Sequence, residues 1–431
     1  MIKFNEQSGG SVMNNSIIEF LNLKDEEIED IKINSLINEL VVEISLKRKE
    51  HQCPSCGCTT SKVLNTYTRK FQHGIFLHRN CIVFYHQKRY RCTVCKFSFN
   101  ETNTLVNKGQ KKSILSHLMI MDFLKDPHIT FKFVAEKLNL SITTIINTFI
   151  NRVPDYRQPL PKVLCIDEIY LGRKSYMKYC AVLLDFETNQ IVDVIYGRTK
   201  SALHSYFQKI PLKQRENVKY LSSDMYEGFR AMKETYLRYS KQCVDAFHVI
   251  QLINVMFENQ IKRIMKQYEQ GSTPYYLLKQ RRGLLLRNGN KIDWTKRGYN
   301  HHFKFVISNH KMRELMFQID PLIESIYRLK EDYLYINALS NVEIVEEKLY
   351  QFISRCINFE HPDVKRVGKT LLKWRTEILN SFTRINGRRI SNGPIESRNN
   401  IIKLIIRNAA GYRNFDHLRL RILYVINSKK E

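Results

Sequence analysis

Two pairs of closely spaced cysteines constrain the fold of the N-terminal part of the chain more than any other feature. Cys53 and Cys56 stand in HQCPSCG, and Cys92 and Cys95 stand in RYRCTVC. Each CxxC pair predicts a tight turn that presents two thiolates, and two such turns complete a tetrahedral zinc site. Because four thiolates leave no open position for water, we expect a structural Zn²⁺ in a zinc ribbon within the N-terminal segment 1–105.

The sequence around these pairs leaves two alternatives. FLHRNCIVFYHQKRYRC, which leads into the second pair, alternates well enough for the β-strands that a zinc ribbon needs. A scatter of buried cysteines would not explain the pairing. Cys58 is a spare thiol and could replace Cys56 as a ligand.

The chain is long and strongly basic. Its 431 residues predict two to four domains, and its 69 Lys and Arg against 42 Asp and Glu give a formal net charge of +27. Such a surplus suits a phosphate backbone or an anionic membrane surface. No apolar run is long enough to span a membrane, and the N-terminus lacks a signal-peptide pattern. We therefore expect a cytoplasmic protein that handles nucleic acid and keeps its cysteines as thiols or metal ligands.

Helical periodicity covers residues 113–153, the main part of a predicted domain 106–155. The pattern breaks at Asn139, and Ser141 suits the N-cap of the next helix. This arrangement favours a helix-turn-helix that reads the major groove of DNA, although such helix pairs also occur as plain packing units. The side chains expected to face the groove are Thr143, Thr144 and Asn147.

The hydrophobic pattern changes its period in the next segment, 160–255. VLCIDEIYLG is a nearly continuous apolar run, typical of a central strand buried on both faces. Two more strands and then alternating helices and strands follow, which is the order of a ribonuclease-H-like mixed α/β sheet. Residues 256–385 are wholly helical in pattern and basic, so we expect an all-α insertion before 386–431 complete the core. The predicted fold class is multidomain α+β.

Acidic residues at three places in this core indicate a metal centre. Asp167 lies in the first core strand, where an unpaired carboxylate costs several kcal/mol to bury. Asp224 ends the fourth strand, which neighbours the first in such a sheet, and Glu396 lies in the closing helix. Three converging carboxylates favour Mg²⁺, and two such ions can clamp the oxygens of a phosphodiester. The alternative for Asp167 is a buried ion pair with an arginine.

The segment SNGPIESRNNIIKLIIR forms a helix with two faces. One face is apolar, and the other carries Glu396 together with Asn400, Lys403 and Arg407. We expect Glu396 to hold metal while its three polar neighbours hold DNA. The plain alternative is a surface helix in which Glu396 pairs with Asn400 and Lys403.

Four further acids and one histidine lie near the predicted centre. Glu168 should point away from Asp167 and be structural, and Asp185 and Asp193 are interpreted as turn residues. Asp245 and His248 form a DxxH pair at the end of the fifth strand, where the histidine could brace the acidic centre.

The helical insertion combines basic and aromatic residues. We expect Arg281 and Arg282 to neutralise phosphates, and an exposed Trp294 to stack on a base unpaired near the cut end. The alternative is a solvated basic face with the aromatic residues in the core.

Taken in order, these motifs resemble the ISL-three family of bacterial insertion-sequence transposases. The motifs are CPxCG, RYRCxxC, IDE, SSDMYEGF, DAFH and SNGPIE with a trailing GYRNFDHLRLRILY. The likeness runs over nearly the whole chain, and its C-terminal signature is the most specific part. Ser397 stands where the family usually has glycine, which bears on the local helix geometry.

The resemblance implies a DDE transposase with a ribonuclease-H-like core split by a helical insertion. The catalytic and Mg²⁺-binding triad would be Asp167, Asp224 and Glu396. The accessory Cys/Asp-x-x-His signature would be Asp245 and His248. Such an enzyme uses two Mg²⁺ ions per active site, with Mn²⁺ as a possible substitute.

The expected function is DNA transposition. The chain would bind the terminal inverted repeats of its element, cut them, and join the freed 3′-hydroxyl to target DNA. Its partners would be double-stranded DNA and further copies of itself, as a homodimer or higher oligomer in the bacterial cytoplasm at the nucleoid. Two alternatives remain: a DNA-binding regulator that has lost catalysis, which would only bind ends, and a ribonuclease-H-like nuclease, which would cut without joining.

Overall fold

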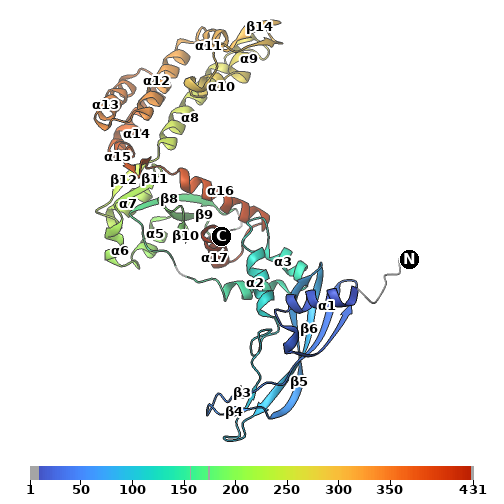
Figure 1. Ribbon diagram of the computed structural model, residues 1–431. Coiled ribbons are helices and arrows are strands. Elements are labelled where there is room, and N and C mark those ends of the chain that lie inside the picture. Colours follow the sequence, from blue (N-terminus) through green and yellow to red (C-terminus); the bar gives the residue numbers. More distant parts are fainter. Residues whose placement is uncertain (1–8, 156, 173–174, 429–431) are drawn as a thin grey trace. The chain divides into compact units, whose positions relative to one another are not determined.

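The computed structural model describes residues 9–155, 157–172 and 175–428 (Figure 1). Helices and sheets both contribute, so the mixed α+β class that the sequence predicts is confirmed. The chain divides into two compact units: residues up to 156 with those from 404 onward, and residues 157–403. Within the described ranges, no helix is both long and apolar enough to cross a membrane.

The first unit begins with helix α1 (Gly9–Phe20) and a five-stranded sheet. The strand order is β1-β2-β6-β5, with β7 paired to β6; β2 and β6 run parallel and the other neighbours antiparallel. Every second residue of β2 is buried, as in a sheet with one face on a core. The strands are β1 (Ile28–Ser35), β2 (Glu39–Leu46), β5 (Val63–Phe76), β6 (Arg79–Arg91) and β7 (Ser98–Asn100), with a separate hairpin of β3 (His51–Gln52) and β4 (Thr59–Thr60).

Three short helices follow: α2 (Ile114–Phe123), α3 (Phe131–Leu138) and α4 (Ile142–Ile150). The side chains of Ser113, Thr130 and Ser141 cap their N-termini by accepting backbone N–H groups. Asn139 adopts the left-handed conformation, with φ of 49°, and so ends α3. The turn predicted between Asn139 and Ser141 is therefore confirmed.

The last helix, α17 (Phe415–Asn427), packs against these three helices. Leu420 joins their buried cluster, and the ring of Tyr424 meets that of Phe149 edge-to-face at 5.4 Å. The buried guanidinium of Arg421 donates to the carbonyl of Asp126. We expected α17 to complete the core with the rest of 386–431, but its apolar face packs on α2, α3 and α4 instead.

The second unit is built on a sheet of order β10-β9-β8-β11-β12. The first three strands form an antiparallel meander, and β11 and β12 run parallel to β8. The middle of β9 is fully buried and β8 is largely so, as predicted for central strands. The strands are β8 (Val163–Tyr170), β9 (Tyr179–Asp185), β10 (Ile191–Tyr196), β11 (Tyr220–Ser223) and β12 (Lys241–Val244).

Helices α5 (Lys200–Phe207), α6 (Leu212–Asn217) and α7 (Glu227–Tyr236) connect the strands of this sheet. Leu203 and Phe207 of α5 and Phe229 of α7 share one buried cluster with Leu164 and Ile166 of β8. Helices α5 and α7 therefore cover one face of the sheet with apolar side chains.

A helical layer lies between β12 and helix α16 (Gly393–Asn408) in the sequence. It has its own core, centred on Phe257, Ile326, Tyr333 and Phe352. The helices are α8 (Ala246–Met265), α9 (Thr273–Gln280), α10 (Gly283–Leu286), α11 (Asn309–Phe317), α12 (Pro321–Ala338), α13 (Val342–Asn358), α14 (Pro362–Lys373) and α15 (Arg375–Asn380).

The prediction that this insertion is wholly helical is wrong. One hairpin interrupts it, β13 (Arg297–Asn300) with β14 (Phe305–Ser308), and a second hairpin, β15 (Arg384–Ile385) with β16 (Arg388–Arg389), begins at its end. The first hairpin contains aromatic and β-branched residues around a turn, which favour strands over helix.

Candidate active site, zinc centre and nucleic-acid contacts

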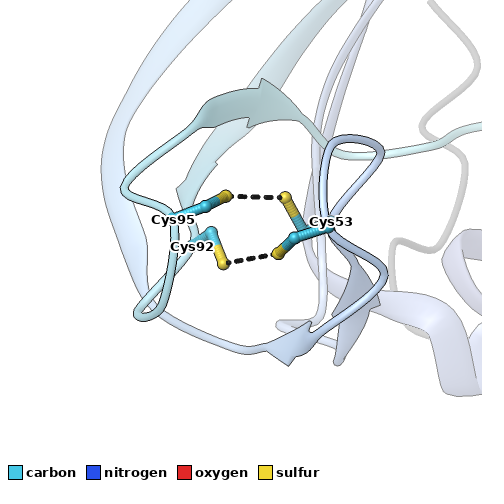
Figure 2. A group of neighbouring side chains, drawn as sticks. Cys53, Cys92 and Cys95 are labelled. Atoms are coloured by element: carbon cyan, nitrogen blue, oxygen red, sulfur yellow. Dashed lines mark hydrogen bonds between the residues drawn. The ribbon is translucent and has the colours of Figure 1, made fainter.

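The four predicted zinc ligands meet at one point. Two sulfur pairs lie close together: Cys53 Sγ is 3.5 Å from Cys95 Sγ, and Cys56 Sγ is 3.6 Å from Cys92 Sγ (Figure 2). All four sulfur atoms lie within 4.8 Å of one another, and Cys58 is outside this group. The geometry therefore selects Cys56 over the spare thiol as the fourth ligand.

The backbone around these sulfurs prepares them to bind a cation. The amide of Gly57 donates to the carbonyl of Cys53 at 2.8 Å, and the amide of Cys92 donates to that of Phe97 at 2.9 Å, which closes the two tight turns. The neighbouring sulfurs raise the pKa of the Cys56 thiol to about 12, whereas backbone N–H groups of Cys95 and Val94 lower the pKa of the Cys92 thiol to about 6. Because zinc binds thiolates, a thiol that ionises this readily fits a closed four-sulfur zinc site.

Asp167 and Asp224, the two predicted core acids, occupy corresponding positions at neighbouring parallel strands. Ser222 of β11 pairs with Cys165 of β8, and the acids Asp224 and Asp167 each stand two residues further on. The parallel pairing of β11 with β8 therefore brings these two positions to the same edge of the sheet. Glu396 comes from the first turn of α16.

The pKa values of the three predicted triad carboxyl groups are all raised. Burial is the main cause that raises the pKa of Asp167 and of Glu396, and it raises the pKa of Asp224 to about 6. The charge of Asp167 adds to the upward shifts of the other two, while the charge of His248 lowers the pKa of all three. The charges of Asp167 and His248 thus reach both Asp224 and Glu396.

The ion-pair alternative for Asp167 is not observed in the part of the chain that the structure describes. Among the described residues, no Lys or Arg forms an ion pair with Asp167, Asp224 or Glu396, so the arginine partner considered for Asp167 is not found there. Their oxygens are more widely spread than the four sulfurs.

Asparagine side chains that the sequence analysis missed join α16 to β8. Asn399 Nδ2 donates to Asp167 Oδ2 at 2.7 Å, and Asn392 Nδ2 donates to the carbonyl of Ile166 at 3.4 Å. The carbonyl of Asn392 accepts the amide of Glu396 at 3.0 Å. Asn399 follows Glu396 by three residues in SNGPIESRNN. This i, i+3 spacing places the two residues on neighbouring positions of the helix surface, and it could have indicated that Asn399 lies near Glu396.

Asp245, of the predicted Asp245 and His248 pair, links the start of α8 to the start of α16. Asp245 Oδ1 accepts the amide of Phe247 and caps α8, while Oδ2 accepts the amide of Asn392 at 2.8 Å. One carboxylate therefore fixes both α8 and the start of the helix that carries Glu396. His248 Nε2 is buried without a hydrogen-bond partner in the described part of the chain.

The remaining acids are placed as follows. Glu168 forms an ion pair with Arg198, whose guanidinium lies 4.2 Å from the centre of the Tyr179 ring. The charge of Glu168 nevertheless raises the pKa of Asp224, so this acid contributes to the field of the site. Asp185 is confirmed as a turn residue because Oδ1 accepts the amide of Glu187 at 2.9 Å.

The interpretation of Asp193 as a turn residue is wrong. Asp193 is buried within β10 and accepts the hydroxyl of Tyr206 at 2.9 Å. A bulge between Ile191 and Asp193 shifts the register of the strand, which periodicity alone did not reveal.

The predicted DNA-facing side chains of α4 and α16 are mostly exposed. Thr143 and Asn147 lie on the outer face of α4, whereas Thr144 is half-buried with its hydroxyl 2.8 Å from that of Ser141. On α16, the outer face carries Asn400, Lys403 and Arg407. The opposite face is buried through Ile395, Ile402 and Ile405.

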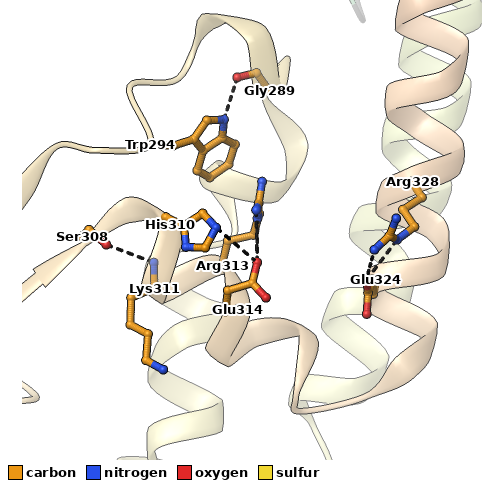
Figure 3. Close-up of polar contacts among 9 residues, drawn as sticks. All are labelled: Gly289, Trp294, Ser308, His310, Lys311, Arg313, Glu314, Glu324 and Arg328. Atoms are coloured by element: carbon orange, nitrogen blue, oxygen red, sulfur yellow. Dashed lines mark hydrogen bonds and ion pairs between the residues drawn. The ribbon is translucent and has the colours of Figure 1, made fainter.

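The three residues predicted to contact DNA from the insertion are engaged within the chain. Trp294 is half-buried: Nε1 donates to the carbonyl of Gly289 at 2.9 Å, and the Arg313 guanidinium lies 4.4 Å from a ring centre (Figure 3). The expected exposed Trp294 is therefore not observed. The other two are bound as well: Arg281 Nη2 donates to the Tyr276 hydroxyl at 3.4 Å, and Arg282 Nε lies 3.4 Å from Glu258.

Comparison with known proteins gives a consistent family and two distant relatives. The model of the ISL-three family of DDE transposases, described as "Transposase", matches residues 164–422, more than half of the chain. A transposase for insertion sequence element IS1001 from Bordetella parapertussis is 20% identical over 278 residues, which cover 63% of this chain and 62% of that protein. A protein named ATP-dependent protease from Lactococcus lactis subsp. lactis is 24% identical over 220 residues, 50% of this chain and 64% of that protein. The chain thus spans slightly under two thirds of the length of each relative.

Proposed function

We propose that this chain, which belongs to the ISL-three family of transposases, cuts and joins DNA through Asp167, Asp224 and Glu396. The observation that carries the proposal is the placement of these acids: Asp167 lies on β8, Asp224 directly follows β11, and Glu396 lies on α16. Their carboxyl pKa values are raised, and none of them has an ion-pair partner among the described residues. The strand order β10-β9-β8-β11-β12, with an antiparallel meander followed by parallel strands, supports a ribonuclease-H-like core.

The three carboxylates would hold two Mg²⁺ ions, or Mn²⁺ in their place. Bound in this way, the ions would stabilise the charge that develops on the attacking and leaving oxygens of a phosphodiester. The oxygen chemistry of the ligands favours these hard cations over zinc, which the thiols of the other unit would take.

Residues around the triad would fix its geometry. Asp167 Oδ2 accepts Asn399 Nδ2 and Oδ1 accepts the amide of Glu168, so both oxygens have a defined direction. Asp245 ties the start of α16 to α8 and thereby orients Glu396. Such fixed positions matter because a small displacement of a reacting group can slow a reaction about 100-fold.

The reaction would proceed in two displacements at phosphorus. Water attacks the phosphodiester at the element end, the bond to the 3′ oxygen breaks, and a free 3′-hydroxyl remains. That hydroxyl then attacks a phosphodiester of target DNA, and the target's own 3′ oxygen leaves. Along the exposed face of α16, Asn400, Lys403 and Arg407 would hold phosphates of the substrate.

End recognition would come from the other unit. The zinc site formed by the four cysteines would stabilise the N-terminal segment, and α4 would place Thr143, Thr144 and Asn147 in the major groove. Two ends must be held for one transposition event, which favours a homodimer or higher oligomer on DNA, at the nucleoid of the bacterial cytoplasm.

One assay separates this proposal from its two alternatives. Purified protein is mixed with labelled element ends, a target plasmid and Mg²⁺, and bound, cut and joined DNA are measured. Transposition predicts labelled ends covalently joined to the plasmid. Cut ends without joining would instead identify a nuclease, and bound but intact ends a regulator.

A further inference from the structure

A two-stranded ribbon in the insertion presents an unusual exposed face. Residues 297–308 form this β13–β14 ribbon, in which Tyr299 pairs with Val306. The inner face is buried through Asn300 and Ile307. On the outer face Tyr299 is 58% exposed, Val306 is 59% exposed, and Arg297 is also exposed. The ribbon therefore covers a core with one side and leaves an aromatic–aliphatic pair open on the other.

The tip of the β13–β14 ribbon is rigidly held. Asn300 Oδ1 accepts the amides of His302 and Phe303 at 3.0 and 3.3 Å and the hydroxyl of Tyr276 at 3.2 Å. The ring of Tyr276, from α9, stacks on that of His302 with a centroid distance of 4.2 Å and an angle of 7°. These contacts restrain the tip.

The base of the ribbon is held as well, and Trp294 has this role. The amide of His310 donates to the carbonyl of Trp294 at 3.0 Å, and that of Asn309 to the carbonyl of Lys296 at 3.1 Å. Figure 3 shows the indole held between Gly289 and Arg313 beside the helix that follows β14. A rigid mount of this kind lowers the entropy cost when an exposed face binds a partner.

The charge around the outer face identifies the class of that partner. No Asp or Glu occurs from residue 294 to residue 313, whereas Lys296, Arg297 and Lys304 are exposed. Phe305, at the end of the tip, is 51% exposed. Exposed apolar side chains within a cationic border fit a polyanion that also offers an apolar surface, which describes the grooves of duplex DNA.

We propose that the β13–β14 ribbon inserts into the major groove of duplex DNA. A two-stranded ribbon has the width that this groove admits, and other β-ribbons read DNA there. Arg297 and Lys304 would contact the flanking phosphates, and Tyr299 and Val306 would lie against base edges. The inference deepens the proposed function, on which it rests, by naming the element of the insertion that touches DNA.

The test measures binding of the full-length protein to a labelled duplex without Mg²⁺, as a function of salt. Each phosphate contact contributes about −0.9 to the slope of log affinity against log salt. If two contacts are lost, the decrease in affinity between about 50 and 200 mM salt should be about tenfold smaller than for the native protein. Arg297→Ala with Lys304→Ala should show this flattening. The matched control is Lys365→Ala with Lys369→Ala, which removes two exposed charges of α14.

The aromatic contact has its own variant pair. Tyr299→Ala should weaken binding about fivefold with an unchanged salt slope, since burial of about 40 Å² of apolar surface against base edges contributes about 1 kcal/mol. Tyr350→Ala, an equally exposed tyrosine of α13, should leave binding unchanged. Without any substitution, bound duplex should protect Lys296 and Lys304 of the native protein from an amine-acetylating reagent, and leave Lys365 and Lys369 reactive.

Several results would overturn the ribbon contact. One is equal salt slopes for the ribbon and α14 variants; another is equal acetylation of all four lysines. A third is loss of self-association in the ribbon variants with unchanged DNA affinity, which would make the surface an interface between copies. Binding is measured without metal, so failure of cleavage by the native protein would refute the proposed function separately.

Discussion

Replacement of Asn399 by alanine tests how the active site is held together. Asn399 is 3% exposed and donates to Asp167 Oδ2 at 2.7 Å across the contact between α16 and β8. A hydrogen bond to a charged group contributes about 1.5–3 kcal/mol. Loss of that bond frees Oδ2, so the carboxylate is held only through Oδ1, which accepts the amide of Glu168 at 2.8 Å.

Two quantities follow for Asn399→Ala. Loss of that hydrogen bond should lower the Tm by a few degrees, because about 1 kcal/mol shifts the Tm of a unit of this size by roughly 2–4 °C. Misplacement of Asp167 should slow cleavage by about 10- to 100-fold at saturating DNA and raise the Mg²⁺ concentration for half-maximal rate.

The assay is single-turnover cleavage of a labelled end, with protein in excess and Mg²⁺ varied. Asn400→Ala is the control, because Asn400 is the next residue of the same helix but is exposed. It should weaken DNA binding and keep the native Mg²⁺ requirement. If Asn399→Ala and Asn400→Ala showed the same Mg²⁺ dependence and the same rate at saturation, the positioning role of Asn399 would be refuted.

Two further predictions concern the metal centres. Cys92→Ser should lose one equivalent of zinc by metal analysis and weaken end binding. Limited proteolysis should show the cleavage unit still folded, because the four cysteines lie in the other unit. Retained zinc would contradict this prediction, and Cys58→Ser is the control. Asp224 has a folded pKa of about 6, above the unfolded value of about 3.9, so its contribution to stability is full at low pH and is lost as pH rises through about 6. Asp224→Asn should therefore stabilise the metal-free protein near pH 7.5 by on the order of 2 kcal/mol and abolish the Tm gain from Mg²⁺; a lower Tm than that of Glu234→Gln, an exposed control on α7, would refute this.

Local patterns were enough to predict the features that depend on local chemistry. The two CxxC spacings dictate tight turns, so the four sulfurs could be grouped from their spacing alone. Ser141 and Asn139 define a cap and a left-handed stop within three residues, so the turn before α4 could be placed. The apolar run around Asp167 similarly identified a buried strand.

The features that escaped the sequence depend on contacts between distant parts of the chain. Asn399 and Asp167 are 232 residues apart, and no periodicity links an asparagine to a particular carboxylate. Trp294 stands among basic residues, which suggested an exposed ring that could stack on a base. In the structure its indole N–H donates to Gly289, and the Arg313 guanidinium lies over the ring. Helix α17 is amphipathic whichever core it joins, so the pattern could not show that it packs beside Phe149.

The most direct test of the catalytic proposal is the amount of labelled element end joined to a target plasmid by triad variants. Asp167→Asn, Asp224→Asn and Glu396→Gln each remove one anionic ligand at nearly constant volume, and Glu234→Gln removes an exposed charge from α7 as a control. At equal end binding and with Mg²⁺, the account predicts joining by the native chain and by Glu234→Gln, and a loss of at least about 1,000-fold in each triad variant, because groups that act as a unit fail together. Robust joining by any one of the three variants would contradict the assignment of that acid to the active site.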